Sequence, residues 1–165
     1  MLPDRALNFI LLTHSRELAK SSNTGQLLLQ AADINAGRIV WSRTEPDETL
    51  LAQIAAGGVG LAWPDGADSS AVPVTACQSC ILIDGTWQEA RKIFNRSAYL
   101  QSLPRLQPQV QGPSCYKLRR NQRENGLSTA ECAAALLKQA GQPAVAENLL
   151  VELQRFQARW RGARA

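Results

Sequence analysis

The chain has 165 residues, of which 45% are hydrophobic and 19% charged, and its formal net charge is +4. A chain of this length forms one domain and buries an adequate core without disulfides. Its four cysteines are too few and too irregularly spaced for a disulfide framework, which favours a reducing, cytoplasmic setting. The apolar run near the N-terminus is too short for a signal peptide or a membrane span, so we expect no membrane partner.

Apolar segments alternate with helical patterns along the first 95 residues. The sequence predicts strands over 8–13, 38–41, 59–63 and 80–83, and helices over 23–32, 47–56 and 86–95. Strands that alternate with helices of this length are typical of a parallel sheet covered on both faces. The predicted fold class is therefore α/β, with a mostly parallel sheet and helices on both of its faces.

The following segment, 100–114, is rich in proline. Pro104, Pro108 and Pro113 exclude a long helix there and predict an extended, loop-rich crossing. Beyond it we expect a short strand over 116–118 and helices over 128–139 and 144–161. No repeat, low-complexity tract or domain boundary interrupts this order, so residues 1–165 are expected to form a single domain.

The strand predicted over 80–83 runs into Asp84, Gly85 and Thr86, and a basic helix follows. In open parallel sheets, ligands bind outside the carboxyl ends of the strands, where a helix N-terminus also offers free N–H groups. Asp84 has two interpretations, either a functional carboxylate or the N-cap of the helix. Thr86 and Glu89 have the spacing of a capping box, so the cap need not be Asp84.

Three loop-to-helix junctions carry hydroxyl groups and backbone N–H donors. They lie at 23–25, 84–87 and 128–129, and in the last of them Ser128 and Glu131 have the spacing of a second capping box. Capping alone explains the junction at 128–129. If the junctions meet at one edge of the sheet, however, the donors at their helix starts would suit a polar cofactor.

Basic residues are concentrated in the second half of the chain. The first 90 residues hold 5 Lys and Arg against 10 Asp and Glu, whereas the last 75 hold 13 against 4. Such clustering is typical of nucleic-acid binding, although a solvated basic face has the same composition. The residues expected to contact phosphates are Arg91, Lys92, Lys117, Arg119, Arg120 and Arg123.

The cysteines do not form a convincing redox or zinc site. Cys77 and Cys80 have the spacing of a redox pair, but Cys80 enters an apolar strand instead of opening a helix, where a thiol pKa would be lowered. Cys115 and Cys132 are isolated and His14 is the only histidine, so a zinc site lacks partners. We therefore expect structural cysteines and no metal. The single histidine also disfavours hydrolysis by a Ser/His/Asp triad.

Several of these motifs recur together in one known family. They are Leu11-Leu12-Thr13-His14 with Glu17, Asn23-Thr24-Gly25, Leu61-Ala62-Trp63-Pro64-Asp65-Gly66, Asp84-Gly85-Thr86-Trp87 with Ala90, Tyr116-Lys117-Leu118-Arg119, and Leu127-Ser128-Thr129-Ala130-Glu131. With them the chain resembles the DTW-domain proteins, relatives of SPOUT-type RNA-modifying enzymes that include tRNA-uridine aminocarboxypropyltransferases. The resemblance spans almost the whole chain. Many relatives also carry an N-terminal cysteine cluster suggestive of zinc, and this sequence has none before its first strand.

The resemblance implies an activity and a fold. The activity is transfer of the 3-amino-3-carboxypropyl group of S-adenosylmethionine to N3 of a uridine in tRNA, with release of methylthioadenosine. The fold is a SPOUT-like sheet with a knotted C-terminal region, which general fold statistics disfavour. The residues expected to bind S-adenosylmethionine are Trp63, Pro64, Gly66, Gly85, Thr86, Trp87, Leu127, Ser128 and Thr129, and the basic residues named above would contact RNA.

Asp84 is the expected catalytic residue, because a carboxylate beside uridine N3 can act as general base while the carbon next to the sulfonium is attacked. Trp87 is expected either to stack on adenine or uracil or to be buried against its helix. Two other functions stay open, a non-catalytic RNA-binding protein and a SPOUT-like methyltransferase that releases S-adenosylhomocysteine. The sequence contains no interface pattern that decides between monomer and dimer.

Overall fold

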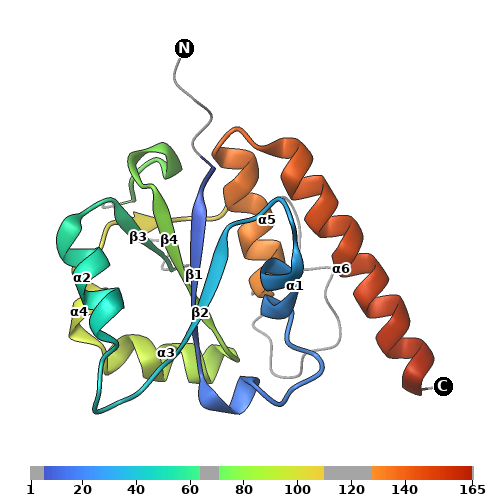
Figure 1. The fold of residues 1–165 in the computed structure, drawn as a ribbon, viewed down its shortest axis with the longest axis horizontal. Coiled ribbons are helices and arrows are strands. Elements are labelled where there is room, and N and C mark those ends of the chain that lie inside the picture. The colour runs from blue at the N-terminus through green and yellow to red at the C-terminus, as the bar shows by residue number, and fades with distance from the viewer. Residues whose placement is uncertain (1–5, 64–70, 110–127, 165) are drawn as a thin grey trace.

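A computed structural model of the chain describes residues 6–63, 71–109 and 128–164. At its centre is a five-stranded, all-parallel sheet with the strand order β2-β1-β4-β3-β5 (Figure 1). The strands are β1 (Asn8–Thr13), β2 (Ala36–Val40), β3 (Val59–Ala62), β4 (Ser79–Asp84) and β5 (Arg105–Leu106). The α/β class and the parallel sheet expected from the sequence are confirmed.

Helices cover both faces of the sheet (Figure 1). One face carries α1 (Gly25–Gln30), α5 (Thr129–Gln139) and α6 (Pro143–Arg164), and the other carries α2 (Glu48–Ala56), α3 (Trp87–Asn95) and α4 (Ala98–Gln101). Two short 3-10 helices, η1 (Ser15–Glu17) and η2 (Val74–Ala76), follow β1 and precede β4. None of the helices in the described ranges is long and apolar enough to cross a membrane.

Two hydrophobic clusters form because successive side chains of a strand point to opposite faces. In β4, Cys80 and Leu82 pack with α1, α5 and α6, whereas Ile81 packs with α2, α3 and α4. Asp84 follows Leu82 by two residues, so its side chain points to the same face of the sheet as those of Cys80 and Leu82. The alternation therefore sends the carboxylate of Asp84 to the side of the sheet that carries α1 and α5.

The helices and strands predicted within the described ranges are all present, with some shifted ends. The helix expected over 23–32 begins only at Gly25 and ends at Gln30. The proline-rich crossing includes the end of α4 and the two-residue strand β5, which adds the fifth strand to the sheet. The strand expected over 116–118 lies outside the described residues. So does the chain path through 110–127, on which a knot would depend.

The described cysteines are free thiols that belong to the core. Cys80 is fully buried, and burial raises the pKa of its thiol well above the usual value. Burial also raises the pKa of Cys132 to about 12, with a further contribution from the charge of Glu131. No group of three or more metal-ligating side chains occurs in the part of the chain that the structure describes. These thiols therefore act as small packing groups.

Cys80 should resist alkylation in the folded protein, because it is fully buried. Since the thiolate is the reactive species, iodoacetamide should label Cys80 at least about tenfold more slowly in buffer than in concentrated urea. Mass spectrometry of fragmented peptides locates the label on each cysteine. Half-buried Cys77 serves as the internal comparison. Labelling of Cys80 at the same rate in both conditions would contradict its place in the core.

Candidate active site

The carboxylate of Asp84 lies at the carboxyl end of β4 and has no exposure to solvent. Its Oδ1 accepts hydrogen bonds from Asn23 Nδ2 and Thr129 Oγ1, both at 2.9 Å. Its Oδ2 accepts from Thr13 Oγ1 at 3.2 Å and from Arg38 Nη2 at 3.4 Å. A buried charge is costly unless it is paired and hydrogen-bonded. These four donors supply that compensation.

The donors come from four separate segments of the chain. Parallel pairing of β1 with β4 places Thr13 beside Asp84. Arg38 reaches the carboxylate from β2, Asn23 from the loop before α1, and Thr129 from the first residue of α5. Since the carboxyl ends of parallel strands lie at one edge of a sheet, this edge is where ligands of such folds bind. Asp84 belongs to one of the three loop-to-helix junctions, and the other two reach it through Asn23 and Thr129, so all three meet at this edge of the sheet.

Close packing of the loop before α1 against Asp84 requires a glycine. A Cβ on Gly25 would lie 2.7 Å from Asp84 Oδ2 and 3.1 Å from Asn23 Oδ1. The first of these distances is shorter than the contacts that real Cβ atoms make. The neighbouring Thr24 is fully buried, and its Oγ1 accepts a hydrogen bond from the backbone N–H of Ala130 at 3.1 Å. The segment Asn23-Thr24-Gly25 thus fastens the start of α1 to both Asp84 and the start of α5.

Helix capping is carried out by other residues. Thr86 Oγ1 accepts from Glu89 N at 3.1 Å, while Glu89 Oε1 accepts from Thr86 N at 2.9 Å. Ser128 and Glu131 make the same reciprocal pair at the start of α5, at 3.2 Å and 3.1 Å. Both capping boxes expected from the sequence are confirmed. Asp84 is therefore not the cap of α3.

A second layer of charged groups surrounds this centre. The side chain of Glu17 is buried and accepts from Lys20 Nζ at 2.7 Å and from Asn23 Nδ2 at 3.1 Å. Glu89 Oε2 lies 3.9 Å from Lys20 Nζ and 3.8 Å from His14 Nδ1. His14 Nδ1 also accepts from the N–H of Arg16 at 3.1 Å, so in the neutral ring the proton is on Nε2. The residues of the opening motif thus lie around Asp84.

The two tryptophans expected to bind the donor lie on the other side of the sheet. The rings of Trp63 and Trp87 stack with centroids 5.3 Å apart, and Trp63 also stacks on Phe94 at 4.4 Å. Trp63 is only 6% exposed and packs in the cluster formed with α2, α3 and α4. The sheet separates this aromatic stack (Trp63, Trp87, Phe94) from the carboxylate of Asp84. Trp87 is half-buried against this cluster, and its expected stacking on adenine or uracil stays a prediction.

The remaining expected site residues divide into two groups. Gly85 and Thr86, which follow Asp84, and Ser128 and Thr129, at the start of α5, adjoin the centre. Outside the described residues are Pro64, Gly66, Lys117, Arg119, Arg120, Arg123 and Leu127.

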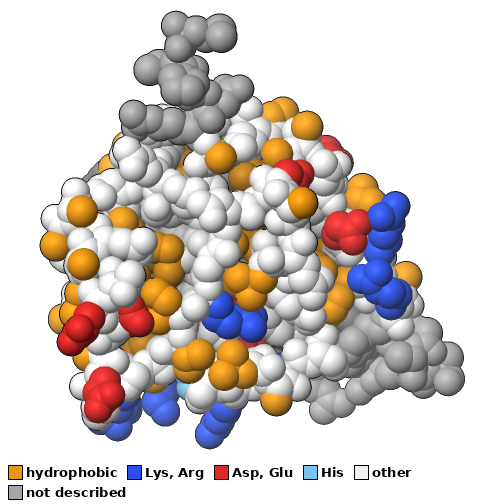
Figure 2. All heavy atoms as spheres, in the orientation of Figure 1, with side chains coloured by type: hydrophobic (Ala, Val, Ile, Leu, Met, Phe, Trp, Pro, Cys, Tyr) orange, Lys and Arg blue, Asp and Glu red, His pale blue; other side chains and the backbone are white. Residues whose placement is uncertain are grey.

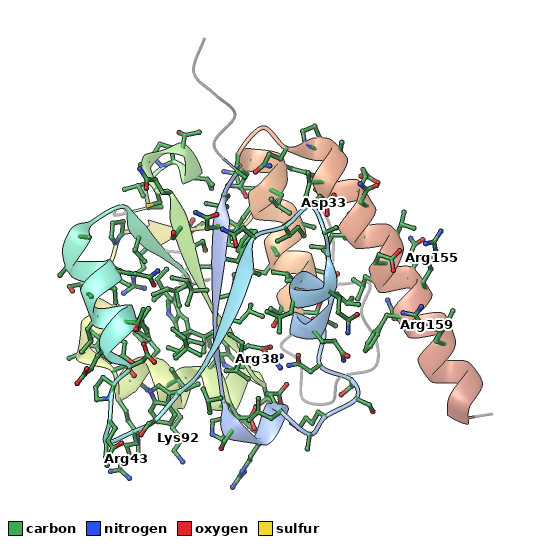
Figure 3. The ribbon with its side chains drawn as sticks, viewed as in Figure 1. Asp33, Arg38, Arg43, Lys92, Arg155 and Arg159 are labelled. Carbon is green, nitrogen blue, oxygen red and sulfur yellow. The ribbon has the colours of Figure 1, made fainter. Side chains whose placement is uncertain are left out.

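Basic side chains of the described residues are dispersed on the face drawn in Figures 2 and 3. Figure 3 places Arg38 near the centre, Arg43 and Lys92 together at one end, and Arg155 and Arg159 along α6. Arg91 and Lys92 are exposed on α3, as RNA contacts would have to be. Their contribution to RNA binding stays a prediction.

Sequence reasoning did not identify Arg38 as a site residue. A basic residue within a short strand has no local pattern that indicates its partner, and the carboxylate that it approaches lies 46 positions further along the chain. The one available signal was its charge inside an otherwise apolar strand.

The family model of the DTW domain matches residues 1–161, which is nearly the whole chain and includes all of the segments that meet at Asp84. No solved structure matches the chain.

Replacement of Gly25 by alanine should destabilise the protein. The added Cβ would displace the Asp84 carboxylate or the Asn23 amide, so Gly25→Ala should lower the free energy of unfolding by about 1–3 kcal/mol. Gly37→Ala in β2 is the matched control, since nothing lies within 4 Å of its Cβ position. Urea denaturation of both variants measures the difference. Equal stabilities would mean that the loop before α1 is not packed against Asp84 as described.

Proposed function

The chain belongs to the DTW-domain family, and on this premise we propose that it transfers the 3-amino-3-carboxypropyl group of S-adenosylmethionine to N3 of a uridine in tRNA. Membership of this family is consistent with tRNA modification. One observation carries the proposal further. The side chains of Thr13, Asn23 and Thr129, each from a different part of the family pattern, all donate hydrogen bonds to the buried carboxylate of Asp84. Such a convergence of polar groups at the ligand-binding edge of a parallel sheet is typical of an active site.

The proposed reaction has a simple balance. The lone pair of uridine N3 forms a bond to the carbon that joins the aminocarboxypropyl chain to sulfur, and the carbon–sulfur bond breaks. Its electron pair returns to the sulfonium, which leaves as the neutral thioether methylthioadenosine. The N3 proton passes to a base or to water. Because the leaving group is already activated, the main duty of the protein is to align acceptor, carbon and sulfur.

The environment of Asp84 supports a positioning role. In the described arrangement both of its oxygens accept hydrogen bonds and neither is exposed, so a uridine N3 has no access to them. Action as general base would require a substrate to displace at least one donor. We propose that Asp84 chiefly fixes the hydroxyl groups of Thr13 and Thr129 and the guanidinium of Arg38 at the sheet edge. The base role expected from the sequence stays a prediction.

The residues proposed to hold the substrates lie around this centre. Gly85 at the start of α3 and Thr129 at the start of α5 would present backbone N–H groups to the polar parts of S-adenosylmethionine, whereas Thr86 and Ser128, whose N–H groups are used in the capping boxes, would present hydroxyl groups. Arg91 and Lys92, exposed on α3, would contact phosphates of the tRNA. Phosphate contacts give affinity without base selection, so the uridine must be recognised as an unstacked base at the sheet edge.

Product analysis tests this function. The purified chain is incubated with S-adenosylmethionine and tRNA that lacks the modification, and the nucleosides and small molecules are identified by mass spectrometry. We expect aminocarboxypropyluridine and methylthioadenosine in equal amounts. Methylated nucleoside with S-adenosylhomocysteine would instead establish a methyltransferase. RNA binding without any product, across several RNA classes, would favour the non-catalytic alternative.

Asp84→Asn is the control for this assay. The amide keeps the shape of the side chain but presents an N–H₂ group to donors that need an acceptor, so the alignment at the sheet edge should be lost. The variant should retain RNA binding and form product at least about 100-fold more slowly, which is the cost of a small misplacement of reacting groups. Full activity would remove Asp84 from both the catalytic and the positioning role.

A further inference from the structure

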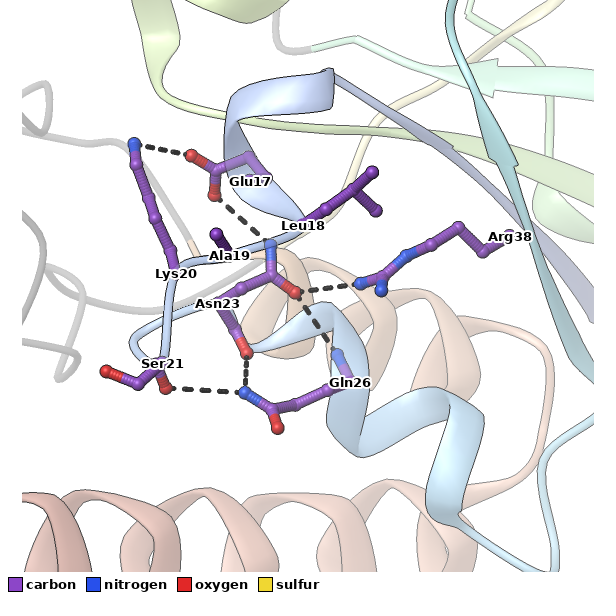
Figure 4. A pocket seen from close by; sticks show the side chains of 8 residues that line it. All are labelled: Glu17, Leu18, Ala19, Lys20, Ser21, Asn23, Gln26 and Arg38. Atoms are coloured by element: carbon purple, nitrogen blue, oxygen red, sulfur yellow. Dashed lines mark hydrogen bonds and ion pairs between the residues drawn. The ribbon is translucent and has the colours of Figure 1, made fainter.

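A polar pocket of about 260 Å³ lies between the segment after β1 and strand β2, and it shares Asn23 and Arg38 with the centre around Asp84 (Figure 4). Its lining consists of Glu17, Leu18, Ala19, Lys20, Ser21, Asn23, Gln26 and Arg38. The volume is below the range of about 300–1,000 Å³ that is usual for pockets holding a complete drug-sized ligand. The pocket therefore fits one part of a larger substrate.

Arg38, at the edge of the pocket, has unused hydrogen-bond donors. Its Nη2 donates to Asn23 Oδ1 at 3.0 Å and approaches Asp84 Oδ2 at 3.4 Å. Its Nε is buried without a hydrogen-bond partner, and within the described ranges Nη1 has no partner either. A guanidinium carries five N–H donors and binds carboxylates well. An under-used arginine at the edge of a pocket is therefore a site for an anionic group.

The charges around the pocket favour a zwitterion over a phosphate. Lys20 is paired with Glu17 at 2.7 Å and lies 3.9 Å from Glu89, so its charge is already compensated. Arg38 is balanced by Asp84, whose oxygens are shared with other donors. A phosphate would bring excess negative charge next to these carboxylates, whereas an α-amino acid group adds no net charge.

The lining also offers an acceptor for an ammonium group. Gln26 Nε2 donates to the carbonyl oxygens of Ser21 and Asn23, at 3.3 Å and 2.7 Å. These two bonds fix the amide and leave its Oε1 without a partner in the part of the chain that the structure describes. Gln26 and Arg38 both line the pocket, so its lining holds an acceptor suited to an α-amino group and a donor suited to an α-carboxylate.

We propose that this pocket binds the α-amino acid group of S-adenosylmethionine and that Arg38 binds its carboxylate. This inference rests on the proposed function and deepens it. The carbon attacked in aminocarboxypropyl transfer belongs to the chain that ends in this carboxylate, whereas the methyl group does not. Arg38, which also contacts Asp84, would thus hold that chain next to the aligned groups of the sheet edge and determine which carbon is transferred.

Calorimetric titration of the full chain with three probes tests the inference. The probes are S-adenosylmethionine, its decarboxylated form and methylthioadenosine, which lacks the amino acid group altogether. Arg38→Gln should weaken binding of S-adenosylmethionine by about 10–100-fold, because a charge-assisted hydrogen bond is lost. The same substitution should change binding of the other two probes less than about twofold, because neither carries the carboxylate.

The control variant is Arg43→Gln. Arg43 is an exposed arginine in the loop after β2 and lines no part of the pocket, so its removal should leave all three affinities unchanged. Arg38→Lys keeps the positive charge without the planar fork and should fall between the wild type and Arg38→Gln. Circular dichroism checks that each variant is folded. If Arg38→Gln does not fold, the wild type alone still tests the idea, since it must bind S-adenosylmethionine at least about tenfold more tightly than the decarboxylated form.

The contradicting outcomes are distinct. Equal losses for all three probes, or equal wild-type affinities for S-adenosylmethionine and its decarboxylated form, would overturn the role of Arg38 and leave the proposed function standing. Competition by inorganic phosphate and none by L-methionine would assign the pocket to a phosphate and also overturn the inference. Failure of the wild type to bind any of the three probes would overturn the proposed function and this inference together.

Discussion

A carboxylate that has lost all contact with water must find its hydrogen-bond donors within the protein, and Asp84 finds them in four segments of the chain. This requirement ties the end of β1, the loop before α1, strand β2 and the start of α5 to one point. Gly25 permits the approach, and the bond from Ala130 N to Thr24 Oγ1 closes the arrangement. The sheet edge is therefore organised before any substrate binds, which lowers the cost of alignment.

Successive side chains of each strand point to opposite faces of the sheet, and the two faces have different roles. On the side of α1 and α5, polar groups gather at the end of β4 and lead into the pocket beside Arg38. On the other side, the aromatic stack of Trp63, Trp87 and Phe94 supports α3, whose first turn follows Asp84 directly. The tryptophan of the Asp-Gly-Thr-Trp motif thus anchors the helix, while its aspartate serves the polar centre.

Local patterns predicted most of the fold and part of the site. The capping boxes at Thr86 and Ser128 could be read from the sequence because each depends on two residues three positions apart. Arg38 could not be recognised, since its importance arises from contacts with Asn23 and Asp84 that only the folded sheet brings together. The ring of Trp63 lies with Leu61 on the face opposite Asp84, as the alternation of side chains along β3 requires, and its expected contact with S-adenosylmethionine stays a prediction.

Hydrogen–deuterium exchange of the wild type and Asp84→Asn tests most directly whether one carboxylate organises the sheet edge. Exchange reports the local opening of each helix separately. Loss of the acceptor should speed exchange in α1 and α5, whose starts are fastened to Asp84, and leave α2 on the other face protected as before. Unchanged exchange in α1 and α5, or an equal loss of protection in all three helices, would contradict this account.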